Sequence, residues 1–128
     1  MRIEHVAVNV ADAKAMAEWY VEHLDFSIIR SGSAPIDMRF IADESKQVLM
    51  EIYNNPECPV PDYPEQNPLM LHVAFVSSDV VADRDRLLAA GASAAGEITR
   101  TPAGDTLAML RDPWGLAIQL CQRAEPML

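Results

Sequence analysis

Two histidines occupy matching positions in two apolar stretches of the chain. His5 begins the run HVAVN and His72 begins the run HVAFV, and an aspartate, Asp12 or Asp79, follows seven positions after each. The His-Val-Ala motif and its aspartate therefore recur at a constant offset of 67 residues. Such an internal repeat indicates two similar structural modules, each with a histidine at the same place in its first strand.

Strand alternation predicts a second polar side chain near each histidine. Neighbouring side chains of a strand point to opposite faces, and residues two apart share one face. Glu51 in QVLMEIY (47–53) and Gln119 in GLAIQL (115–120) both point away from the face of their aliphatic neighbours. His5 and His72 alternate with apolar residues in the same way. All four side chains are expected on the sheet faces that no helix covers.

Each of the four residues has a plain interpretation when taken alone. A histidine in a strand is commonly a hydrogen-bonded core residue, and a glutamate between aliphatic residues is commonly the solvent side of a strand. Their paired occurrence favours a ligand set instead. Imidazole nitrogen, carboxylate oxygen and amide oxygen suit one divalent ion such as Zn, Ni, Co, Mn or Fe(II), bound by His5, Glu51, His72 and Gln119.

The same order of elements, one strand, one helix and three strands, is predicted in each half. Asp12 and Asp79 are good N-caps for helices at 13–24 and 80–90, where apolar residues recur at helical spacing. Strands are predicted at 2–10, 26–30, 36–42, 47–53, 69–77, 94–101, 105–111 and 116–121. The chain is therefore expected to be α+β, a single domain over 1–128, with module 1 (1–54) and module 2 (69–122). Five prolines mark the irregular connection 55–68 between them.

Composition narrows the classes of partner. The 128 residues carry a net charge of −9, and half of them are hydrophobic. An acidic surface disfavours nucleic acid and anionic membranes, and no segment approaches the roughly 20 apolar residues that span a bilayer. The chain shows no basic and apolar leader. Cys58 and Cys121 lack metal-type spacing, so a reduced, cytoplasmic protein is expected.

These features resemble the vicinal oxygen chelate superfamily, which includes glyoxalase I, bleomycin- and fosfomycin-resistance proteins, methylmalonyl-CoA epimerase and extradiol dioxygenases. The segment LRDPWGLAIQL (110–120) looks like the closing hairpin and last strand of that family, and ADAKAMAEWYVEHLDFSI (11–28) resembles its first helix. The resemblance implies two βαβββ modules whose curved mixed sheets enclose a metal. The first and last strands of each module would supply its ligands, as the four residues above would.

The ligand pattern is closest to that of glyoxalase I. This resemblance implies a metal-dependent lyase or isomerase that acts on a small substrate with vicinal oxygens through an enediolate-type intermediate. Glu51 is the candidate catalytic base, because glutamine, unlike the glutamate usual at position 119, cannot take a proton at neutral pH. Asn9 stands where glyoxalase I carries an arginine that anchors glutathione. The candidate substrate-binding residues are Tyr53, Asn55, Met109 and Arg111, of which Asn55 matches a glutathione-contacting position.

Two alternatives remain open. An Fe(II) extradiol-type dioxygenase would use His5, His72 and Glu51 as a two-histidine, one-carboxylate triad, although that class takes its carboxylate from the last strand. A metal-free binding protein of the antibiotic-resistance type would sequester a small molecule, and the acidic charge favours a cationic one. The resemblance also implies a homodimer.

Overall fold

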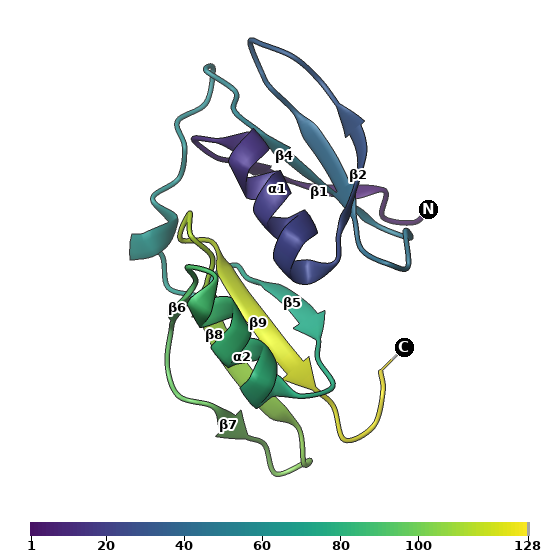
Figure 1. Ribbon diagram of the computed structural model, residues 1–128, viewed down its shortest axis with the longest axis vertical. Coiled ribbons are helices and arrows are strands. Elements are labelled where there is room, and N and C mark those ends of the chain that lie inside the picture. The colour runs from purple at the N-terminus through teal and green to yellow at the C-terminus, as the bar shows by residue number, and fades with distance from the viewer. Residues whose placement is uncertain (128) are drawn as a thin grey trace. The chain divides into compact units, whose positions relative to one another are not determined.

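The computed structural model describes residues 1–127. It divides into two compact units, Met1–Pro61 and a second unit that begins at Asp62 (Figure 1). The boundary lies inside the proline-rich connection predicted at 55–68. Each unit contains one helix and one mixed sheet, so the expected α+β class is confirmed.

The first unit is a four-stranded sheet with one helix. Its elements in chain order are β1 (His5–Asn9), α1 (Ala13–Leu24), β2 (Ser27–Ser31), β3 (Arg39–Ala42) and β4 (Leu49–Tyr53). The strands lie in the order β1-β4-β3-β2, and β1 runs parallel to β4 while the other pairs are antiparallel. The first and last strands of the module are therefore direct neighbours.

The second unit repeats this topology. Its elements are a 3-10 turn (Tyr63–Glu65), β5 (Val73–Val76), α2 (Val80–Ala89), β6 (Ser93–Ala94), β7 (Thr99–Arg100), β8 (Thr106–Arg111) and β9 (Ala117–Gln122). The strand order is β5-β9-β8-β6, and β7 also pairs with β8. Here β5 runs parallel to β9, as β1 does to β4.

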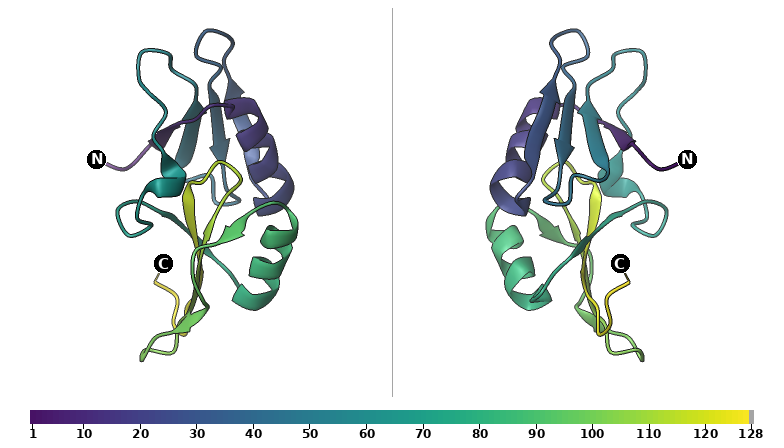
Figure 2. Two further views of the ribbon diagram at one scale, coloured as in Figure 1. Left: turned by 90° about the vertical axis from the view of Figure 1, so that its left-hand side faces the viewer. Right: turned by 90° about the vertical axis from the view of Figure 1, so that its right-hand side faces the viewer.

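Each helix starts at its predicted aspartate and covers one face of its own sheet. The carboxylate of Asp12 accepts a hydrogen bond from the Ala15 amide, and that of Asp79 accepts one from the Ala82 amide. Helix α1 packs on β2, β3 and β4, and α2 packs on β6, β8 and β9, as Figure 2 shows. Among residues 1–127, no helix has the length and apolar character needed to cross a membrane.

Four predicted strands differ from the structure. Those predicted at 2–10 and 36–42 begin only at His5 and Arg39. The strand predicted at 69–77 begins only at Val73, because Asn67 holds the preceding residues in a turn. Its side-chain oxygen accepts from the Leu69 amide, and its backbone carbonyl accepts from the Met70 amide. The strand predicted at 94–101 is broken into β6 and β7, and Gly96 lies between them with a φ of +134°.

Gly115 provides a test of the β8–β9 connection. Its φ is +87°, and an added Cβ would meet Pro64 at 2.5 Å from two ring carbons and 2.8 Å from the backbone nitrogen. Gly96 also has a positive φ, but an added Cβ there would meet nothing within 4 Å. Backbone strain of about 1–3 kcal/mol is common to both positions, whereas a clash adds about 1–3 kcal/mol at Gly115 alone.

We therefore expect Gly115→Ala to lower the free energy of unfolding more than Gly96→Ala does. Urea denaturation of the two variants beside the parent measures the difference. Equal losses in the two variants would show that the contact with Pro64 does not constrain position 115.

Candidate functional site

In the first unit, β1 and β4 bring His5 and Glu51 together. The register pairs Ala7 with Glu51. His5 lies two residues before Ala7 and therefore points to the same face of the sheet. The Nε2 atom of His5 lies 3.5 Å from Oε2 of Glu51. Phe40, opposite Glu51 on β3, meets the His5 ring edge-on, with ring centroids 5.5 Å apart. The two predicted ligands are thus neighbours beside an aromatic wall.

The other ring nitrogen of His5 is held by a carboxylate. Nδ1 contacts the side-chain oxygen of Glu4. Because a carboxylate accepts hydrogen bonds, Nδ1 is the donor to Glu4, and Nε2 is the ring nitrogen that lies nearest Glu51. A histidine that binds metal commonly donates its second ring N–H to a carboxylate or a carbonyl.

The second unit places His72 and Gln119 at the equivalent positions. Ala74 pairs with Gln119 on the parallel strands β5 and β9, as Ala7 pairs with Glu51. His72 lies immediately before β5 and is held by its Nδ1 atom, 2.9 Å from the carbonyl oxygen of Pro68. A carbonyl only accepts, so Nδ1 is the donor of this hydrogen bond. Gln119 Oε1 accepts from the Cys121 thiol at 3.2 Å.

These donor sets fit a divalent ion. Two ligand atoms that each lie about 2.1 Å from one tetrahedral ion are about 3.4 Å apart, close to the 3.5 Å between His5 and Glu51. Both histidines have Nδ1 engaged and Nε2 directed elsewhere. Within residues 1–127, no three His, Cys, Asp or Glu side chains gather around one point. Each unit by itself offers one imidazole and one side-chain oxygen.

The residues predicted to bind substrate near Glu51 differ in their contacts. Tyr53 lies two residues after Glu51 on the same strand face and is half-buried. Asn55 is part of a tight loop, in which its side-chain oxygen accepts from the Glu57 amide. The backbone amide of Asn55 donates to Asn9 Oδ1 at 2.8 Å.

Asn9, which the sequence does not mark as a structural residue, organises this loop. Its side chain is 6% exposed. Besides accepting from Asn55, it donates from Nδ2 to the Cys58 carbonyl at 2.8 Å. The sequence signal for this role is a polar residue, Asn9, in an otherwise mostly apolar strand, because a buried amide needs hydrogen-bond partners.

In the second unit, Met109 lies directly opposite Gln119 on β8. Arg111 donates from Nη1 to the carbonyls of Tyr63 and Gly115, at 2.7 and 2.9 Å, and from Nη2 to the Gln66 carbonyl at 2.5 Å. Its guanidinium therefore holds the 3-10 turn against the β8–β9 hairpin. Substrate binding by either residue stays a prediction.

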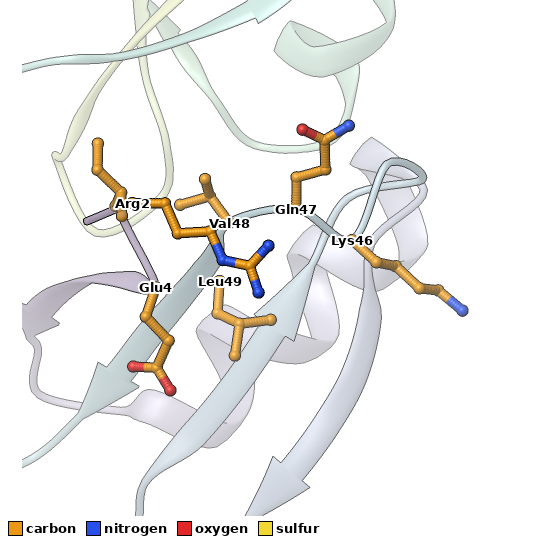
Figure 3. A pocket seen from close by; sticks show the side chains of 7 residues that line it. Arg2, Glu4, Lys46, Gln47, Val48 and Leu49 are labelled. Atoms are coloured by element: carbon orange, nitrogen blue, oxygen red, sulfur yellow. The ribbon is translucent and has the colours of Figure 1, made fainter.

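A cavity of about 600 Å³, lined by both charged and aliphatic residues, lies at the starts of β1 and β4. Figure 3 shows the Arg2 guanidinium above Leu49, with Glu4 on one side, while the Lys46 side chain points away. Glu4 both lines this cavity and contacts His5. Glu4 therefore lies between this cavity and the His5–Glu51 pair.

Residues 2–120 match the model of the Glyoxalase/Bleomycin resistance protein/Dioxygenase superfamily. The match covers nearly the whole chain, which therefore belongs to this superfamily. The family expected from the repeat and the closing hairpin is confirmed. Comparison with curated proteins found no match.

Solved structures show the same fold. TnmS3, an antibiotic binding protein from Streptomyces sp. CB03234, is 24% identical with a TM-score of 0.73, and 97% of each chain is covered. A glyoxalase family protein from Enterococcus faecalis is 27% identical with a TM-score of 0.72, covering 94% of this chain and 97% of that one. Glyoxalase I from Zea mays is 22% identical with a TM-score of 0.75. The match covers 97% of this chain but only 45% of the maize protein.

The two cysteines should differ in reactivity. Cys121 is 4% exposed, and burial raises the pKa of its thiol, whereas Cys58 lies exposed in the loop after β4. Only the thiolate attacks thiol reagents. We expect one fast-reacting thiol per native chain at about pH 8 with a chromogenic disulfide, and none in Cys58→Ser. A second fast thiol in the native protein would contradict the burial of Cys121.

Proposed function

We propose that this protein is a metal-dependent lyase or isomerase that acts on a small substrate with two neighbouring oxygens. One divalent ion, Zn, Ni, Co, Mn or Fe(II), would be held by His5, Glu51, His72 and Gln119. The observation that carries the proposal is the 3.5 Å separation of His5 Nε2 and Glu51 Oε2. The other ring nitrogen of His5 is held by Glu4. Membership of a superfamily that contains glyoxalases supports it.

The residues of the chain divide the chemistry. When bound, the ion supplies stabilisation of negative charge on a carbonyl oxygen of the substrate. Glu51 would remove the proton from the carbon next to that carbonyl and return it to the former carbonyl carbon. The hydroxyl proton would pass to the former carbonyl oxygen, which gives an isomer of the substrate. Gln119 would offer its amide oxygen to the ion but takes no proton. The half-buried position of Glu51, against Phe40, limits the access of water.

A metal measurement tests the ligand set. We expect near-stoichiometric metal in the purified parent and at least about tenfold weaker affinity in His5→Ala and in His72→Ala. His23→Ala is the matched control, because His23 lies in the last turn of α1 rather than on a strand. Metal content after dialysis, followed by competition with a chelator, gives the affinities.

Two results would contradict this assignment. Metal retained equally by the parent and both strand variants would place the ion elsewhere. A parent that binds none of the five metals would favour the alternative of a metal-free small-molecule binder. The homodimer and the cytoplasmic location expected from the sequence stay predictions.

The base is tested by isotope exchange. The metal-loaded protein in heavy water should exchange the carbon-bound proton of hydroxyacetone or a related hydroxyketone, as followed by proton NMR. Glu51→Gln should slow the exchange by about 10²-fold or more, the usual contribution of a general base, and Glu44→Gln on the exposed β3–β4 turn should not. Unchanged exchange in Glu51→Gln would remove Glu51 from the chemistry.

A further inference from the structure

The second unit holds a cavity of about 650 Å³ with a different character from the one in the first unit. Its walls are β5 and the residues just after it, the end of β9, and Pro126 and Met127 of the segment that follows. Cavities of about 300–1,000 Å³ hold small organic ligands. The question is what group this cavity fits.

The floor of the cavity continues the strand face that carries Gln119. In the parallel pair β5–β9, Ala74 lies opposite Gln119 and Val76 lies opposite Cys121. Ala74, Val76 and Cys121 all line the cavity, and the Cys121 thiol donates to the side-chain oxygen of Gln119. The cavity therefore begins one residue pair away from Gln119, on the same face.

The outer wall is held in place by Asp105. One oxygen of its carboxylate pairs with Nη1 of Arg123 at 2.7 Å, and the other accepts from the Ala124 amide at 3.0 Å. The Ala124 amide and the Arg123 guanidinium lower the pKa of Asp105, so the carboxylate stays charged and both contacts persist at neutral pH. These two contacts hold Arg123 and Ala124, which directly precede the segment that contains Pro126 and Met127.

Charge and exposure indicate the kind of group that fits. Of the described residues that line the cavity, Arg123 alone is charged, and Asp105 neutralises it. Val76 is 91% exposed although it lies within a strand, and Met127 is 76% exposed. Binding of an uncharged apolar group would bury this apolar surface and so lower the free energy of the system.

We propose that this cavity is a subsite for an uncharged apolar arm of the substrate, whose oxygens lie toward Gln119. The proposal rests on the proposed function for the oxygens, and it adds that the substrate is an apolar-substituted compound. Val76 and Met127 are the residues that contact the arm.

Binding of a neutral apolar dye tests the cavity without any metal. N-phenyl-1-naphthylamine, whose fluorescence rises in apolar surroundings, is titrated into chelator-treated protein. Val76→Asp should weaken its binding by at least about tenfold, because a carboxylate in an apolar contact is costly, and Met127→Asp should weaken it similarly. Val81→Asp is the matched control, since Val81 is a 53% exposed valine on α2 that does not line the cavity. Circular dichroism confirms that the variants fold.

The metal-loaded protein tests whether the arm belongs to a substrate. Exchange of the carbon-bound proton is compared for 2-hydroxyacetophenone, which has a phenyl arm, and hydroxyacetone, which has none. We expect a preference for the phenyl compound in the parent and in Val81→Asp that is lost in Val76→Asp. Absence of dye binding, equal dye binding in Val76→Asp and Val81→Asp, or a preference that survives in Val76→Asp would overturn the subsite. Dye binding that depends on Val76 without exchange of either compound would instead overturn the proposed function and support the cavity.

Discussion

The parallel pairing of the first and last strand in each module is the constraint on which the candidate site depends. Parallel neighbours need a crossover connection, and here each connection contains a helix and the intervening strands. The helix buries one face of the sheet and leaves the other for polar side chains (Figure 2). A slip of one residue in this register would turn Glu51 or Gln119 toward the helix.

The register alone does not orient the imidazoles, and the two units achieve this differently. Glu4 precedes His5 directly and contacts its Nδ1 atom. His72 instead uses the carbonyl of Pro68, which the turn around Asn67 brings into reach. The Nδ1 atom is thus engaged by a charged side chain in one module and by a backbone group in the other.

The sequence predicted the parts of the structure that depend on local rules. Both helices begin after Asp12 and Asp79, because an N-cap acts through its own first turn. Strand alternation placed Glu51 and Gln119 on the faces opposite the helices, because the period of a strand is fixed. Both inferences need only neighbouring residues, and the structure confirms them.

The features that the sequence did not predict depend on particular hydrogen-bond partners, some local and some distant along the chain. The late start of β5 follows from the Asn67 turn, which overrides the strand preference of Leu69 to Leu71. Asn9 bonds two loop residues that lie 46 and 49 positions away. Arg111 bonds two carbonyls that lie 45 and 48 positions away. Whether a polar side chain meets a backbone group or a ligand is decided by the tertiary fold, and composition does not encode it.

The repeated backbone carries different chemistry in its two halves. In the first unit His5 contacts two carboxylates, Glu4 and Glu51. Glu4 also lines a cavity together with Arg2. In the second unit the Pro68 carbonyl holds His72, and the neutral Gln119 replaces a carboxylate on β9. The only charged residue among the described residues that line the second cavity, Arg123, is paired with Asp105. Replacement of a carboxylate by an amide removes a base but also removes the charge that would draw water to an apolar cavity. Under the proposed function, Gln119 would therefore contribute to recognition in the second unit, and Glu51 to proton transfer in the first.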